Sequence, residues 1–186
     1  MRYSRGVAVA LALLGVGWRA PVAVAAPPTF FWASPQSAPT PLPAGPAPFR
    51  ALSRFAAEEP LQRFTLSLAA GATETIGVLV PAGAPPVELT VLAPDGGEFS
   101  LPSLPAPQFA WLGGIRLRRT IRYPYVATVG GSYGVVVQPG AAGSGEPYVL
   151  EGNAVGHSLL FGARPGPADV LRAPVTWLQT LLWLWG

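Results

Sequence analysis

Short apolar runs between Leu61 and Glu151 alternate with polar residues and are interrupted by Gly and Pro at near-regular intervals. Alternation with a period of two places apolar side chains on one face of a strand and polar ones on the other. Phe64, Leu66 and Leu68 show this pattern. Short strands separated by turns every 8–12 residues or so are typical of sandwiches. We therefore predict an all-β, antiparallel, jelly-roll-like β-sandwich over residues 60–162.

Turn residues mark where the individual strands end. Pro94-Asp95-Gly96-Gly97 has the chemistry of a tight turn, because Pro presets φ, Asp caps its own backbone and Gly accepts a positive φ. We expect loops over 81–86, 102–107 and 139–145. The expected strands are 63–68, 73–80, 87–91, 98–101, 115–123, 125–129, 133–138 and 147–152.

Residues 1–25 have the layout of a secretory signal peptide. Arg2 and Arg5 supply the positive start, an apolar run follows over 7–16, and Ala23-Val24-Ala25 is a small-x-small cleavage site. An uncleaved membrane anchor is the alternative, but the apolar run is well short of the ~20 residues that a span needs. We expect an exported protein that is periplasmic, envelope-associated or extracellular.

Residues 26–59 read as a Pro-rich linker, since eight of the 22 residues from Pro27 to Pro48 are Pro. Such a segment lacks amide donors and favours extended polyproline geometry. The aromatic run Phe30-Phe31-Trp32 either packs against the edge of the domain or forms a recognition motif. Residues 49–59 are expected to form one short helix that ends before Pro60.

Charge and cysteine content exclude several classes of function. All 12 basic residues are Arg, and three of them lie in the signal peptide, so the exported chain carries nine basic and nine acidic residues. Nucleic-acid binding needs a basic excess, and we expect no nucleic-acid partner. The chain has no Cys, which excludes disulfides, thiol catalysis and thiolate metal sites.

Candidate catalytic and metal-binding residues lack the partners that their chemistry requires. Ser132 lies in a G-x-S-x-G spelling, but a nucleophile elbow needs a following helix and here Val135 to Val137 indicates a strand. His157, the only histidine, has no carboxylate at a metal-ligand spacing. Asp95 and Glu98 could hold a cation, although the turn explains Asp95 without one. We expect no catalytic set, no metal and no cofactor.

Four arginines between Ile115 and Tyr123 form the one basic cluster, namely Arg116, Arg118, Arg119 and Arg122. In a regular strand Arg116, Arg118 and Arg122 share a face, with Leu117 and Ile121 opposite. Guanidinium groups bind carboxylate, phosphate and sulfate well. With Tyr123 nearby, this face is a candidate surface for an envelope protein or an anionic glycan. The alternative is a solvated face that pairs with Glu74, Glu88 or Glu98 across strands.

The C-terminal tail, residues 163–186, is expected to end in a short apolar helix over 174–185. Twelve residues at about 1.5 Å each give a length of roughly 18 Å, which is too short to span a bilayer. Trp177, Trp183 and Trp185 make this helix a second candidate surface. It docks on its own domain or on a twin, or it contacts a membrane surface or a partner.

Four motifs carry a resemblance to a known family. They are Phe64 to Gly71 (Phe-Thr-Leu-Ser-Leu-Ala-Ala-Gly), the strand-Pro-Asp-Gly turn of Leu89 to Gly96, and Gly131-Ser132-Tyr133 leading into a Val-rich strand, followed by a closing Pro147-Tyr148-Val149-Leu150. Over about residues 60–153 the chain resembles the bacterial pre-peptidase C-terminal (PPC) domain. The resemblance implies a compact jelly-roll sandwich that is non-catalytic and attached to exported proteins. Pro85 and Pro86 replace the acidic pairs that often precede the third strand of such domains, and we expect no peptidase beside this one.

Three functional hypotheses follow. The leading one is an exported, non-catalytic β-sandwich module that binds or scaffolds at the cell envelope. The second is a small secreted hydrolase or peptidase-accessory protein, which would have to use Ser132 and His157. The third is a membrane-surface or assembly protein that acts through its Trp-rich C-terminal helix.

Overall fold

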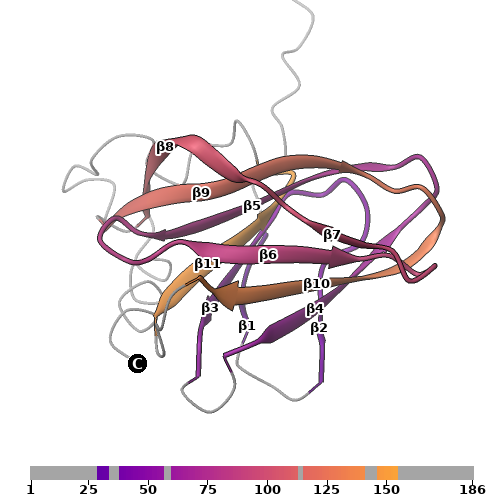
Figure 1. The fold of residues 1–186 in the computed structure, drawn as a ribbon, viewed down its shortest axis with the longest axis horizontal. Coiled ribbons are helices and arrows are strands. Elements are labelled where there is room, and N and C mark those ends of the chain that lie inside the picture. Colours follow the sequence, from indigo (N-terminus) through magenta and orange to yellow (C-terminus); the bar gives the residue numbers. More distant parts are fainter. Residues whose placement is uncertain (1–28, 34–37, 57–59, 113–114, 141–145, 155–186) are drawn as a thin grey trace, which may run out of the picture.

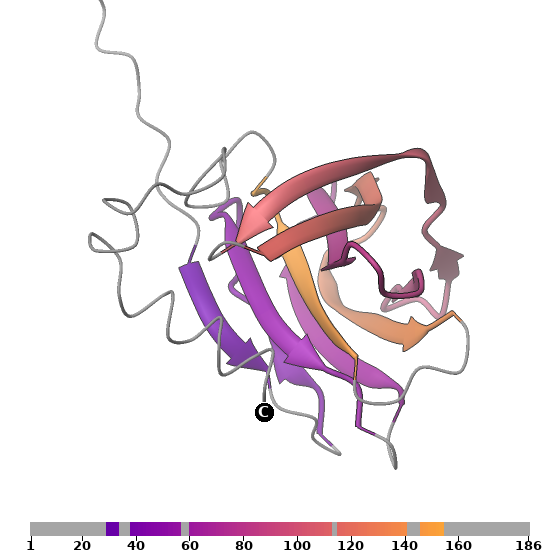
Figure 2. The ribbon, with the colours of Figure 1, turned by 90° about the vertical axis from the view of Figure 1, so that its left-hand side faces the viewer.

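The computed structural model describes residues 29–33, 38–56, 60–112, 115–140 and 146–154. These residues form two β-sheets that face each other (Figures 1 and 2). The strands are β1 (Thr29–Ala33), β2 (Thr40–Pro41), β3 (Phe49–Arg54), β4 (Gln62–Leu68), β5 (Thr73–Pro81), β6 (Val87–Leu92), β7 (Glu98–Ser100), β8 (Ser103–Leu112), β9 (Ile115–Val126), β10 (Gly131–Pro139) and β11 (Pro147–Gly152). In this described part, no helix has the length and apolarity needed to cross a membrane.

The chain passes between the two sheets several times. The first sheet has six strands in the order β1-β3-β11-β5-β9-β8, and the second has five in the order β2-β4-β10-β6-β7. Most neighbours are antiparallel, but β1 runs parallel to β3 and β2 runs parallel to β4. The predicted all-β sandwich is therefore confirmed, whereas a purely antiparallel arrangement is wrong because both sheets are mixed. The jelly-roll connectivity stays a prediction.

The main core lies between the sheets and follows the alternation read from the sequence. In β4 the buried residues are Gln62, Phe64, Leu66 and Leu68, and their neighbours are exposed or partly exposed. Tyr133 of β10 is fully buried, and its hydroxyl donates to the Val129 carbonyl at 2.6 Å. A buried tyrosine hydroxyl needs such a partner. This bond fixes the turn that leads into β10.

A second apolar cluster lies on the other face of the first sheet. It contains Leu52, Leu79, Leu112, Leu117 and Val149. Residues on either side of these in β3, β5 and β11 belong to the main core. Successive side chains of a strand point to opposite faces, so the middle of this sheet is buried on both of its faces.

The short helix expected over 49–59 is wrong where the structure describes it, because residues 49–54 form strand β3. Phe49 and Ala51 face the main core while Leu52 joins the second cluster. A strand buried on both faces is apolar throughout, and periodicity does not distinguish such a run from a buried helix. The residues 57–59 lie outside the described ranges.

The Pro-rich segment is not simply a spacer. Residues 29–33 form edge strand β1 and residues 40–41 form edge strand β2, each beside a strand of a different sheet. Phe31 packs against the main core and Phe30 against the second cluster. Packing of these two aromatic residues on the domain edge is therefore confirmed.

Two further sequence expectations change in the first sheet. The loop expected over 102–107 is wrong, since Ser103 begins β8. The two strands expected around Pro124 form one continuous strand, β9. Figure 2 shows β8 and β9 curving together across the top of the view. The signal peptide, His157 and the C-terminal helix lie outside the described residues.

Candidate functional site: an arginine-lined cavity between two strands

The strands β8 and β9 separate in the middle of their pairing. Ser103 pairs with Ile121 and Gln108 pairs with Arg119, so β8 advances five residues while β9 advances two. Pro105 and Pro107 lie in the extra length of β8. Proline has no N–H for the ladder, so this part of β8 cannot pair regularly. The segment 104–107 consequently arches away from β9, and we call it the β8 arch.

A β-bulge lies at the same place on the other side of β9. The register between β5 and β9 shifts between Val78 and Leu79, which pair with Ile121 and Arg119. Thr120 is the extra residue and has no register partner on β5 or on β8. Bulges re-aim the side chains that follow them and often occur near functional sites. The Thr120 hydroxyl makes one long contact, 3.5 Å, to the Val78 carbonyl.

The bulge divides the arginine cluster between the two faces of the sheet. Arg118 lies opposite Val80, which faces the main core, whereas Arg122 lies opposite Gly77 on the other face. Directly opposed residues of an antiparallel pair share a face. The expected common face of Arg116, Arg118 and Arg122 is therefore wrong, because one extra residue at Thr120 reverses the alternation. Leu117 and Ile121 are separated in the same way, into the second cluster and the main core.

The guanidinium group of Arg118 makes one hydrogen bond and keeps a further N–H donor for another acceptor. Its Nη2 donates to the Ala84 carbonyl at 2.7 Å, which ties β9 to the loop between β5 and β6. Its Nε is buried and has no hydrogen-bond partner among the residues that the structure describes. Nearly all buried polar groups in folded proteins are hydrogen-bonded, so an unpaired N–H on a charged side chain is exceptional.

Arg119 lies on the opposite face of the sheet from Arg118 and forms an ion pair with Glu151. Its Nε donates to Glu151 Oε1 at 2.6 Å, while Glu151 Oε2 lies 3.5 Å from Arg50 Nε. Arg50 and Glu151 have no exposed surface. Burial lowers the pKa of Arg50 below its ordinary value, and attraction by Glu151 opposes this shift. One carboxylate thus serves two arginines, so this cluster keeps a net positive charge.

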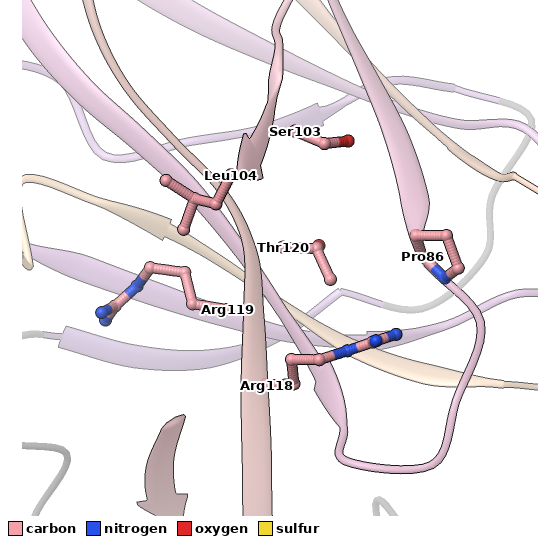
Figure 3. Close-up of a pocket in the computed structure, with 6 residues that line it drawn as sticks. All are labelled: Pro86, Ser103, Leu104, Arg118, Arg119 and Thr120. Atoms are coloured by element: carbon pink, nitrogen blue, oxygen red, sulfur yellow. The ribbon is translucent and has the colours of Figure 1, made fainter. Parts of the chain in front are cut away.

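The β8 arch and the bulge leave a cavity of about 140 Å³ along β9 (Figure 3). Figure 3 shows Arg118 and Arg119 leaving the strand toward opposite sides, with Thr120 and then Ser103 above Arg118 in this view. The residues that line the cavity are Pro86, Ser103, Leu104, Arg118, Arg119 and Thr120. Its walls therefore combine guanidinium groups, two hydroxyls and two apolar side chains.

The other predicted site residues lie apart from this cavity. The Arg116 guanidinium stacks 3.8 Å from the centre of the Phe109 ring, and Arg122 is exposed on the opposite face. Tyr123 contacts Phe99, with ring centres 5.4 Å apart, in a larger hollow of about 310 Å³ at the other end of β9. No charged residue lines that hollow. Trp177, Trp183 and Trp185 lie outside the described residues.

The ion pairs expected for the arginines differ from those in the structure. Within the described ranges, both ion pairs use Glu151, whereas Glu74 accepts from Asn153 and Glu88 accepts from Gln138. Glu151 lies in the apolar run Tyr148-Val149-Leu150, and Arg50 lies between Phe49 and Ala51. A single charge within a buried strand needs an opposite charge nearby. This rule is the sequence signal that could have predicted the ion pair between Arg50 and Glu151.

Ser132 occupies the start of a strand rather than a nucleophile elbow. It is exposed, belongs to β10, and pairs with Ser67 of β4. The sequence interpretation as a turn into a strand is confirmed. Asp95 Oδ1 accepts from the Gly97 N–H at 3.1 Å, and Gly96 has a φ of 88°, as the turn interpretation requires. Among the described residues, no three Asp, Glu, His or Cys side chains gather as a metal site would need.

Comparison with known proteins gives structural likenesses only, since no family model and no curated protein matches the chain. The chain is similar to the pre-peptidase C-terminal domain of a collagenase from Bacillus anthracis, with 12% identity and a TM-score of 0.36 over 67% of this chain and 95% of that one. It is also similar to PliG from Aeromonas hydrophila, a periplasmic inhibitor of g-type lysozyme, with 15% identity and a TM-score of 0.38 over 67% of this chain and 97% of that one. The PPC resemblance stated from the sequence thus appears among solved structures as well. Neither likeness assigns a ligand or an activity to this chain.

Proposed function

We propose that this protein is an exported, non-catalytic binding module of the cell envelope, and that it contacts its partner through the cavity beneath the β8 arch. The observation that carries the proposal is Arg118, which lines this cavity and has a buried Nε with no hydrogen-bond partner. The signal-peptide pattern of residues 1–25 supports export.

The use of polar groups elsewhere supports a scaffold role for the rest of the sandwich. Glu151 holds Arg50 and Arg119, and the Tyr148 hydroxyl donates to Gln62 at 2.6 Å across the two sheets. These side chains hold the fold together and have little exposed surface, so they are poorly placed to meet a partner. Arg118 differs from them because it lines the cavity, where a ligand can use part of its donor capacity.

Envelope fractionation combined with affinity capture tests the proposal. The exported protein, immobilised and exposed to an envelope extract, should retain a discrete partner. Arg118→Gln should lose that partner, while Arg122→Gln should keep it, because Arg122 is an equally charged residue of β9 on the opposite face. Cytoplasmic retention of the protein, or equal capture by both variants, would contradict the proposal.

A further inference from the structure

We infer that the cavity beneath the β8 arch binds the carboxylate of an acidic side chain on a protein partner. This inference rests on the proposed function and names the chemistry of its ligand. It follows from three properties of the cavity: its charge, its unused hydrogen-bond donors and its apolar walls.

The charge around the cavity favours an anion. Within the described part of the chain, Arg118 makes no ion pair, and its one hydrogen bond is to a neutral carbonyl. Arg119, on the other wall, shares Glu151 with Arg50. Within the described residues, Arg118, Arg119 and Arg50 together have one acidic ion-pair partner, Glu151, and an incoming negative group would balance the positive excess. Low polarity around these partly buried groups strengthens such an attraction.

The donors match a carboxylate. A guanidinium presents its N–H groups in a planar fork, which binds the two oxygens of a carboxylate side by side. The Nε–H of Arg118 is the arm of that fork without an acceptor. Ser103 adds a hydroxyl donor from β8, while the Thr120 hydroxyl of β9 makes only a long contact, 3.5 Å, to the Val78 carbonyl. A carboxylate oxygen has lone pairs enough to accept from both the guanidinium and a hydroxyl.

The apolar walls select among anions. Leu104 of the arch and Pro86 of the β5–β6 loop line the cavity together with the polar groups, and Figure 3 shows them on opposite sides of it. A Glu or Asp side chain carries its carboxylate on a methylene stem, and that stem loses contact with water when it lies between such groups. Phosphate and sulfate have no apolar part to place there.

A titration of the ¹⁵N-labelled exported protein with propionate tests the inference, because propionate is the side chain of Glu reduced to its stem and carboxylate. We expect the Arg118 Nε–H resonance to shift with saturation, at an affinity on the order of millimolar, as suits one charge-assisted fork. The Arg122 Nε–H resonance should not saturate. Phosphate and sulfate at the same ionic strength should bind at least about threefold more weakly than propionate.

Two matched variants complete the experiment. Arg118→Lys keeps the charge but removes the fork, and it should weaken propionate binding about tenfold or more. Arg122→Lys should bind like wild type. If Arg118→Lys fails to fold, the selectivity of the wild-type protein for propionate over phosphate and sulfate decides the question.

Several results would overturn the inference. They are an Arg118 resonance that never saturates, binding that survives in Arg118→Lys, and phosphate or sulfate binding as tight as that of propionate. Partner capture that depends on Arg118 without any propionate binding would leave the proposed function standing and reject only the carboxylate. Propionate binding without any partner capture would leave the carboxylate site standing and reject the proposed function.

Discussion

Glu74 is a buried carboxyl group whose replacement by Gln should change how stability depends on pH. Its side chain is 1% exposed and lies at the end of the main core in β5. Its Oε2 accepts from Asn153 Nδ2 at 2.7 Å, while its Oε1 has no hydrogen-bond partner. Burial raises the pKa of Glu74 from 4.5 to about 7, and the Asn153 hydrogen bond opposes only part of that shift.

The sign of the effect follows from proton binding. Between pH 4.5 and 7 the folded protein holds the Glu74 proton and the unfolded chain releases it, so stability falls as the pH rises through this window. Below the window both states are protonated and the contribution is fully present. A pKa shift from 4.5 to about 7, at 1.36 kcal/mol per pH unit, makes the total loss about 3 kcal/mol.

Denaturant unfolding of wild type and Glu74→Gln at pH 5 and pH 8 measures this loss. Wild type should lose roughly 2–3 kcal/mol of unfolding free energy between the two pH values relative to the variant, because Gln keeps an oxygen for Asn153 but never ionises. Titratable groups that both proteins share cancel in the comparison. An equal pH dependence of the two proteins, or a wild type that is relatively more stable at pH 8, would refute the reasoning.

Other substitutions test the rest of the structure. Glu151→Gln should cost about 3–5 kcal/mol in denaturant unfolding, since it leaves the buried Arg50 without its carboxylate; a loss under 1 kcal/mol or so would contradict that role. Gly77→Ala should cost about 1–3 kcal/mol, because its Cβ would lie 2.9 Å from Glu151 Oε1, whereas Gly83→Ala meets nothing within 4 Å and should stay within about 0.5 kcal/mol of wild type. Deletion of residues 174–186 should reduce binding to liposomes if the Trp-rich helix is a membrane contact, and unchanged binding in a flotation assay would exclude it.

The strands that sequence predicts well are those buried on one face. In β4 the apolar residues are buried and their polar neighbours are exposed or partly exposed, and in β10 Tyr133, Val135 and Val137 are buried at alternate positions, so the period of two is visible. The turn at Asp95 is equally readable, because only residues tolerant of its backbone angles suit it.

The sequence did not predict the strands correctly where a strand is buried on both faces or lies at the edge of a sheet. In β3 the apolar residues Phe49, Ala51 and Leu52 are buried on both faces of the strand, and this run resembles a helix as much as a strand. Prolines in β2 and β8 suggest loops, yet they are tolerated because both are edge strands. Whether these segments form strands depends on their position in the sheet, and that position follows from tertiary contacts.

The candidate site was predicted only in part. The sequence pointed to the arginines of β9, and Arg118 does line the cavity. The division of the cluster depends on the bulge at Thr120, and a bulge of one residue leaves no mark in a pattern that contains four arginines in seven positions. The pairing of Arg119 with Glu151 joins residues far apart in the chain, so local spacing could not reveal it.

Site-specific photo-cross-linking in the producing cells tests most directly whether the β8 arch is the working surface. A photoreactive phenylalanine analogue at Leu104, which lines the cavity, should give a discrete adduct with an envelope protein. The same analogue at Val126, an exposed residue at the far end of β9, should give none. The adduct at position 104 should disappear when Arg118→Gln is added. An adduct that persists in Arg118→Gln, or no adduct from position 104, would contradict the account.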